Sequence, residues 1–270
     1  MHGKERAIAP LACRFLKARV VVPAGLDTDR FGTFSREIPR AGTPLDAARA
    51  KIDAALASMP GARIGIASEG SFGPHPHSPF VAIGSELVVW FDRQTGLEVA
   101  GAHTGPATHF ASMPVTSVAQ AIAFARRVEF PGHGIILIGT RDGKPAPECG
   151  LHKNIDTMER FESETRTLIH RQGAAWIETD MRAHRNPARM RAIKRAMLDL
   201  VRNILSRCPA CSRPGFVVTE RVPGLPCSAC NYPTDVTRAL VSTCAGCGYS
   251  LSNPANEVGA DPSRCDCCNP

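Results

Sequence analysis

Four pairs of cysteines near the C-terminal end of the sequence constrain the fold more than any other feature. Each pair encloses two residues, and the pairs begin at Cys208, Cys227, Cys244 and Cys265. Two thiolates at this spacing bind one face of a Zn²⁺ ion, and a second pair completes a tetrahedron. The sequence therefore predicts two zinc sites, with the ligands Cys208, Cys211, Cys227, Cys230, Cys244, Cys247, Cys265 and Cys268.

The pairing of these four knuckles stays open at the level of sequence. We expect sequential ribbons, in which the first knuckle pairs with the second and the third with the fourth; a crossed arrangement would pair the first with the third. In either arrangement the metal is structural, because four thiolates leave no coordination position for water. Such ribbons bind nucleic acid or protein, or they stabilise a small appendage whose core is too thin to fold alone.

Length and charge limit the class of protein. A chain of 270 residues with 43% hydrophobic content can bury a core and exceeds the usual size of one domain. No apolar run approaches the roughly 20 residues of a membrane span, and within residues 1–23 the cations Arg14, Lys17 and Arg19 fall where a signal peptide would be apolar. We expect a cytoplasmic protein without a membrane partner. The net charge of +7 favours an anionic partner, either a phosphorylated small molecule or a nucleic acid.

Alternating helical and strand patterns over residues 1–206 predict an α/β core, a mixed sheet flanked by helices, followed by a small Cys-rich module of two zinc ribbons over 207–270. The best-signalled helix begins at Thr43, which suits an N-cap, and ends before Pro60. A glycine-rich and proline-rich stretch at 141–153 predicts a mobile loop. Strands are predicted at 19–22, 64–66, 135–138 and 174–177, with a hairpin over 81–102 and further helices over 117–130, 156–171 and 187–206.

The predicted strand at 64–66 leads into a segment with one carboxylate, Glu69, among small residues and glycines. Glycine loops that follow buried strands often carry the chemistry of α/β proteins. A lone acid among small neighbours is accessible to a metal ion or to water. The alternative is a surface turn with a solvated glutamate.

Three other segments contain residue types suited to the same pocket. A lysine follows a glycine just before a helical pattern in which Ile8, Leu11, Phe15 and Leu16 share a face. An acid and a lysine lie on the helix that begins at Thr43, and a His-Arg pair precedes the last helix of the core. In chain order the four segments are His2-Gly3-Lys4, Asp46 to Lys51, Ser68-Glu69-Gly70 and Ala183-His184-Arg185.

In these segments, residues 1–206 resemble the superfamily of inosine triphosphate pyrophosphatases and Maf-like nucleotide hydrolases. The whole chain resembles an uncharacterised bacterial family with a doubled zinc-ribbon tail. The resemblance implies Mg²⁺-dependent hydrolysis of nucleoside triphosphates or of a related phosphorylated metabolite. It assigns Mg²⁺ binding and catalysis to Asp46 and Glu69, and contacts to the nucleotide and its phosphates to Lys4, Lys51, Gly70, His184 and Arg185.

Two further expectations follow. In the family a strand precedes the phosphate-binding turn, so we expect that the true start of the protein lies upstream of Met1. Glu178, Asp180 and Arg182 would share one face of a strand, because side chains alternate with a period of two. We regard them as second-rank ligands of the same pocket.

Simpler interpretations exist for most of these residues. Asp46 could be a first-turn helix acid that interacts with the helix dipole, and Lys51 a solvated helix residue. His103, His109 and His133 have no partner at ligand spacing, and no site is predicted for them. The basic segment 187–206 could be a solvated face, or it could bind a phosphate backbone together with the ribbons. The alternative function is therefore a non-catalytic nucleic-acid-binding protein, and a scaffold protein is a third possibility.

Overall fold

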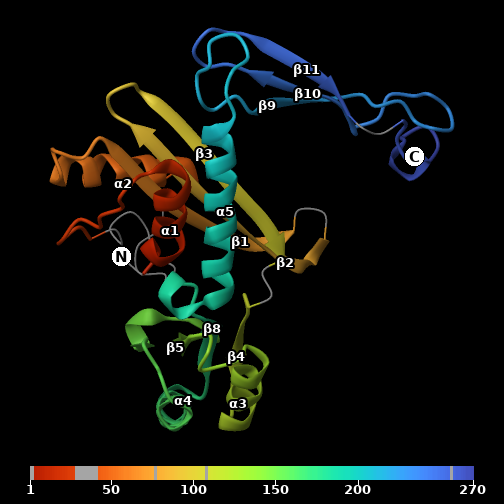
Figure 1. Ribbon diagram of the computed structural model, residues 1–270. Coiled ribbons are helices and arrows are strands. Elements are labelled where there is room, and N and C mark those ends of the chain that lie inside the picture. Colours follow the sequence, from red (N-terminus) through yellow and green to blue (C-terminus); the bar gives the residue numbers. More distant parts are fainter. Residues whose placement is uncertain (1–2, 28–41, 76–77, 107–108, 256–257) are drawn as a thin grey trace. The chain divides into compact units, whose positions relative to one another are not determined.

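The computed structural model describes residues 3–27, 42–75, 78–106, 109–255 and 258–270. The chain divides into two compact units, residues 1–201 and residues 202–270. Both units contain β-sheet, and the helices lie mainly in the first (Figure 1). Among the described residues, no helix is both long and apolar enough to cross a membrane.

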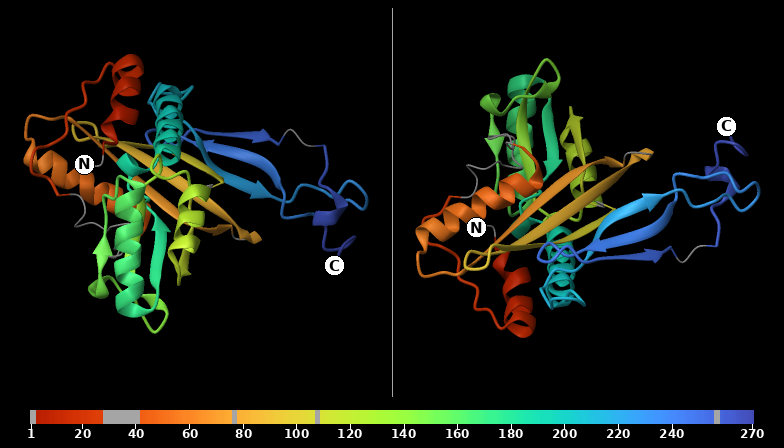
Figure 2. Two further views of the ribbon diagram at one scale, coloured as in Figure 1. Left: turned by 90° about the horizontal axis from the view of Figure 1, so that it is seen from below. Right: turned by 90° about the horizontal axis from the view of Figure 1, so that it is seen from above.

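The first unit contains a three-stranded antiparallel sheet of long strands. Its strands are β1 (Ile64–His75), β2 (Ser78–Asp92) and β3 (Leu97–Pro106), in the order β1-β2-β3. Helix α2 (Pro44–Ser58) covers one face of this sheet, while α1 (Glu5–Leu16) and α5 (Pro187–Leu205) lie on the other side (Figure 2). Because β1 is an edge strand, its outer carbonyl and amide groups face other elements rather than a further strand.

Helix α2 begins as its sequence predicts. The Thr43 side chain accepts a hydrogen bond from the backbone N–H of Asp46, and the Asp46 carboxylate accepts one from the backbone N–H of Thr43, which completes a capping box. Its apolar side buries Ala48, Ile52 and Leu56 against Ala67 of β1 and Val89 of β2.

Helix α5 packs directly against the backbone of β3. A Cβ added at Gly101 would lie only 2.1 Å from the backbone nitrogen of Leu200, so glycine is required for this close approach. A hydrogen bond also joins α5 to β3: the Asp199 carboxylate accepts it from the backbone N–H of Ala102 at 2.9 Å.

A second antiparallel sheet lies in the same unit. It has the order β4-β8-β5-β6, with β7 also paired to β5, and α3 and α4 pack on it. Aromatic and branched side chains such as Phe124, Phe161 and Ile177 fill its core. The bounds are β4 (Ser112–Val115), α3 (Val118–Arg127), β5 (Ile135–Arg141), β6 (Lys144–Pro145), β7 (Leu151–His152), α4 (Met158–Gln172) and β8 (Ala175–Thr179).

The second unit is a three-stranded antiparallel sheet with one cysteine knuckle before its first strand, one in each connection between strands and one after its last strand. The strands are β9 (Val218–Pro223), β10 (Thr237–Thr243) and β11 (Ser250–Pro254), in the order β11-β10-β9. Few side chains of these strands are buried, so the sheet has little apolar core of its own.

The presence of sheets and helices together is as predicted, but four details differ. The named strands pair antiparallel, so the expected mixed sheet is not found among the described residues. Residues 19–22 form no strand, and Val21 and Val22 are about half exposed, at 50% and 48%. Glu69 lies inside β1 rather than in a loop after it. The stretch 141–153 contains two short strands paired with β5.

Candidate functional site

Five charged side chains gather around the edge strand β1, and we name them the charge cluster: Lys4, Lys51, Glu69, Glu86 and Arg189. They come from the turn before α1, from α2, β1 and β2, and from α5. Glu69, Glu86 and Arg189 are 4%, 0% and 3% exposed. Buried charges at this density need partners, because an uncompensated buried charge costs several kcal/mol.

Two ion pairs lie on opposite faces of the sheet. On the α2 side, the Lys51 ammonium donates a hydrogen bond to the Glu69 carboxylate. On the α5 side, Arg189 Nε donates to Glu86 Oε1 at 2.6 Å, and Arg189 Nη1 donates to the backbone carbonyl of Met181. The Arg189 guanidinium also lies over the ring of Phe72, 5.5 Å from its centroid.

Lys4 stands at the strand edge close to both pairs. Its ammonium donates a hydrogen bond of 2.9 Å to the backbone carbonyl of Ser68. Burial, together with the positive charges of Arg189 and Lys51, lowers the pKa of Lys4 to about 7, although Glu69 and Glu86 oppose the shift. The cluster therefore carries a net charge of +1 when Lys4 is protonated and zero when it is not, and the change falls near neutral pH.

Gly70 makes room for the pair on the α5 side. A Cβ at this position would lie 2.6 Å from Glu86 Oε1 and 2.8 Å from Arg189 Nη2. Gly70 is also the residue opposite Glu86 in the register of β1 and β2. Gly70, one of the glycines that predicted a loop, therefore lies in a strand and lets the charged side chains of Glu86 and Arg189 pack against the strand backbone.

The His-Arg segment before α5 lies near the start of the chain. A Cβ added at Gly3 would be 3.8 Å from the Cβ of His184, and His184 is exposed. Arg185 points elsewhere: it donates to Asp156 Oδ1 at 2.5 Å and to the backbone carbonyl of Ile155 at 2.6 Å.

The predicted common strand face of Glu178, Asp180 and Arg182 is not formed, because β8 ends at Thr179 and only Glu178 lies within it. Asp180 is fully buried and forms a bidentate ion pair with Arg182, in which Arg182 Nη2 donates to Asp180 Oδ2 at 2.6 Å. The Arg182 guanidinium also donates to Asn154. Glu178 lies inside β8 and is 8% exposed.

Asp46, the other predicted catalytic acid, lies in the α2 capping box. Its Oδ2 accepts hydrogen bonds from Thr43 N at 2.9 Å and Thr43 Oγ1 at 2.7 Å, and these bonds lower the pKa of the exposed Asp46 carboxyl. The simpler interpretation of Asp46, an acid of the first helical turn, therefore describes its position in the structure. Lys51, by contrast, is not the solvated residue of the simpler interpretation, because its side chain is only 14% exposed and pairs with Glu69.

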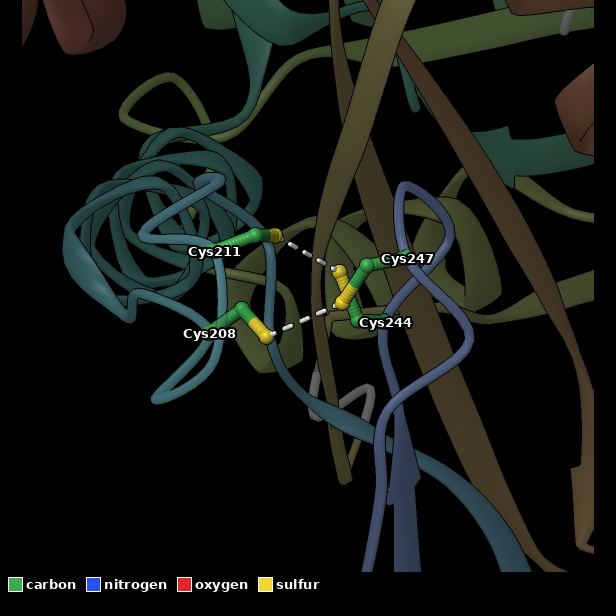
Figure 3. Close-up of side chains that lie close together, drawn as sticks. All are labelled: Cys208, Cys211, Cys244 and Cys247. Atoms are coloured by element: carbon green, nitrogen blue, oxygen red, sulfur yellow. Dashed lines mark hydrogen bonds between the residues drawn. The ribbon is translucent and has the colours of Figure 1, made fainter.

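The eight cysteines form two groups of four, and the grouping is crossed. Cys208 and Cys211 face Cys244 and Cys247 (Figure 3), and a second group brings together the pairs that begin at Cys227 and Cys265. The expectation of sequential ribbons is therefore wrong. The reason is the sheet: β9, β10 and β11 carry the chain back and forth, so alternate knuckles meet at the same end.

The geometry of both groups fits a tetrahedral zinc ion. Across each group the Sγ···Sγ distances are 3.6 to 3.9 Å, and a tetrahedron with Zn–S bonds of about 2.3 Å requires about 3.8 Å. Backbone N–H groups of Ala229 and Gly246 donate to the sulfurs of Cys227 and Cys244. Bonds from backbone N–H groups, those of Ala229 and Cys230 for Cys227 and those of Cys247 and Gly246 for Cys244, lower the pKa of Cys227 to about 7 and that of Cys244 to about 6. In the same two groups the neighbouring thiols raise the pKa of Cys211 and of Cys268 to about 12. Each group could hold one zinc ion.

Sequence reasoning missed two members of the charge cluster and one histidine group. Glu86 and Arg189 are 103 residues apart, and only the fold brings them together. His109, Glu129 and His133 also meet, although the histidines are far apart in the chain. No spacing rule detects either contact.

The fold and its sites define a two-unit protein: an α/β unit with a buried charge cluster, and a cysteine-rich unit with two groups of metal-ligating thiols. The family model described as "Domain of unknown function (DUF6671)" matches residues 53–270, and the chain belongs to this family. The match includes Glu69, Glu86, Arg189 and all eight knuckle cysteines. No curated protein and no solved structure matches the chain, and the resemblance to the inosine triphosphate pyrophosphatases gains no support from these comparisons.

The lowered pKa of Lys4 predicts a pH-dependent stability. Between about pH 7 and the ordinary lysine pKa of 10.5, the unfolded chain binds more protons at this position than the folded chain. The free energy of unfolding therefore rises with pH in this window, by up to about 1.4 kcal/mol per pH unit. Lys4→Met should remove that slope in denaturant titrations between pH 7.5 and 9.5, and the exposed-site control Lys194→Met should keep it. Equal slopes in wild type and Lys4→Met would contradict the shift.

The crossed grouping predicts different zinc contents for two double variants. Cys208→Ser with Cys244→Ser removes two ligands from one group, so the zinc content should fall by one ion per chain relative to wild type. Cys208→Ser with Cys227→Ser removes one ligand from each group, so both cysteine sites should be weakened and the zinc content should fall by up to two ions per chain. Metal analysis of the purified proteins measures the difference, and sequential ribbons would give the reverse result.

Proposed function

We propose that the protein is a Mg²⁺-dependent hydrolase of phosphoanhydride bonds that acts on a nucleoside triphosphate or a related phosphorylated metabolite. The observation that carries this proposal is the convergence of Lys4, Lys51 and Glu69, from three separate segments of the chain, around the edge of β1. The charge cluster has three cations and two carboxylates, and the pKa of one of its cations, Lys4, is about 7. A site that can gain a proton near neutral pH suits an anionic ligand whose charge changes during reaction.

In this proposal the cations of the cluster bind the phosphate groups. Lys4 gains a proton when an anion approaches, because the anion's negative charge raises the lysine pKa again. Lys51 neutralises a second phosphate oxygen and at the same time releases Glu69 from their ion pair. His184, exposed beside Gly3, is the residue we assign to the base of the nucleotide.

Glu69 is the residue we propose as the carboxylate ligand. Its oxygens match the preference of Mg²⁺ for hard donors, and Mg²⁺ commonly binds one or two carboxylates together with substrate phosphates. When bound, Mg²⁺ would neutralise charge on the phosphates. Asp46 is not part of this proposed set, since Thr43 holds its carboxylate at the start of α2.

We also propose that each cysteine group binds a zinc ion and that both ions are structural. The sulfur distances and the backbone N–H bonds to sulfur support zinc, and the shallow burial of β9 to β11 supports a structural role. A sheet with so little apolar core gains much of its folding free energy from its metal.

The hydrolase proposal predicts a specific loss in one variant. Glu69→Gln should lower Mg²⁺-dependent pyrophosphate or phosphate release by roughly 100-fold or more, measured over a panel of nucleoside triphosphates. Glu98→Gln is the matched control, because Glu98 also forms an ion pair with a basic residue of α2, Arg49, at 2.7 Å, but outside the cluster. The control should retain wild-type turnover.

Loss of folding must be separated from loss of chemistry. The double variant Lys51→Gln with Glu69→Gln keeps a neutral hydrogen-bonded pair and avoids an uncompensated lysine. It should unfold near the wild-type midpoint and remain inactive. Wild-type turnover in either Glu69 variant, or no turnover of any nucleotide by the folded wild type, would contradict the proposal.

One observation favours a second candidate, binding of nucleic acid by α5. Arg191, Lys194 and Arg195 are exposed and lie three and four positions apart, so they share a helix face. Arg189 is excluded from this surface because it is buried against Glu86. If the panel of nucleotides gives no turnover, this face becomes the better candidate, and its signature would be an affinity for RNA or DNA that falls steeply with salt.

A further inference from the structure

A third group of metal-ligating side chains lies in the first unit, away from the cysteines. His109 precedes β4, while Glu129 and His133 lie in the turn between α3 and β5. The backbone N–H of His133 donates to the carbonyl of Glu129 at 3.1 Å, which closes the turn and brings these two side chains to one side. One potential ligand atom from each of the three residues lies within 4.8 Å of the others.

The contacts within this group are close but are not hydrogen bonds. Glu129 Oε2 is 3.9 Å from His109 Nε2 and 3.7 Å from His133 Nδ1, and both distances exceed hydrogen-bonding range. The two imidazole rings stack, with centroids 3.7 Å apart and planes 12° from parallel. The two imidazoles and the carboxylate therefore lie close together, but no hydrogen bond joins the carboxylate to either imidazole.

Buried nitrogens in this group lack partners. Nδ1 of His109 and Nδ1 of His133 have no hydrogen-bond partner within the described part of the chain, and the His133 side chain is only 5% exposed. A buried polar atom left in this state costs about 1–3 kcal/mol and calls for a ligand or an ordered water.

We infer that His109, Glu129 and His133 form a binding site for a divalent transition-metal ion, separate from the two cysteine groups. Two imidazole nitrogens and one carboxylate oxygen suit zinc or a similar first-row ion and do not suit Mg²⁺, which prefers oxygen alone. Three protein ligands leave at least one coordination position open, as in catalytic rather than structural sites.

Metal binding requires a small rearrangement that the surroundings permit. Ligand atoms about 2.1 Å from one ion lie roughly 3.0 to 3.4 Å apart, so the present distances must shorten and the stacked rings must turn. The Glu129 side chain is 69% exposed and free to rotate. Coordination by His133 Nδ1 places the ring proton on Nε2 and gives up a long contact, 3.4 Å, from the backbone N–H of Ala188.

The test counts zinc equivalents on the full chain. Calorimetric titration with Zn²⁺ should show one more equivalent for wild type than for His109→Gln, whatever the cysteine groups hold. Glu129→Gln, which alters an exposed side chain, should fold normally and weaken this additional equivalent about 10-fold or more. Far-UV circular dichroism checks that each variant is folded.

A matched control comes from another His–Glu contact. His152 and Glu164 form an ion pair in the same unit, and the double variant His152→Gln with Glu164→Gln should keep the additional equivalent. The inference is overturned if wild type and His109→Gln bind the same number of zinc ions. It is also overturned if Glu129→Gln binds the additional equivalent as tightly as wild type does.

Discussion

The first unit depends on two buried ion pairs that lie on opposite faces of its three-stranded sheet. Lys51–Glu69 ties α2 to β1, and Glu86–Arg189 ties α5 to β2. Removing one partner of such a pair leaves an uncompensated buried charge, which costs about 3–5 kcal/mol. Lys4 occupies the strand edge and bonds to the outward carbonyl of Ser68, so the start of α1 covers backbone that could otherwise pair with another chain. The charge cluster thereby joins α1, α2 and α5 to the three-stranded sheet.

The second unit is organised by strands that run between two thiol groups. β10 has seven residues and so spans about 23 Å, which separates the two groups by roughly the length of the sheet. The same antiparallel path brings the first knuckle to the third and the second to the fourth. With little apolar burial in these strands, the proposed zinc ions would supply the cross-links that a larger core supplies elsewhere.

Local signals in the sequence predicted local structure well. The capping residues of α2, the hairpin over 81–102 and the apolar strand at 135–138 all occur. The valines near residue 21 predicted a strand because β-branched residues favour one, but no neighbouring strand pairs with them in the described chain. Glycines in β1 predicted a loop, whereas Gly65 and Gly70 allow α2 and the Glu86–Arg189 pair to approach the strand.

Long-range contacts set the limit of prediction for the sites. The spacing of the cysteines identified all eight members of the two groups but could not choose between a sequential and a crossed grouping, since both satisfy the same tetrahedron. Lys4, Lys51 and Glu69 do converge, but their partners Glu86 and Arg189 have no local signature. Binding of an anionic phosphate to this cluster should be accompanied by uptake of a proton at Lys4. Calorimetry of pyrophosphate binding near pH 7.5, in buffers of different ionisation enthalpy, should show proton uptake that Lys4→Met loses; equal proton uptake by wild type and Lys4→Met, or no binding, would contradict it.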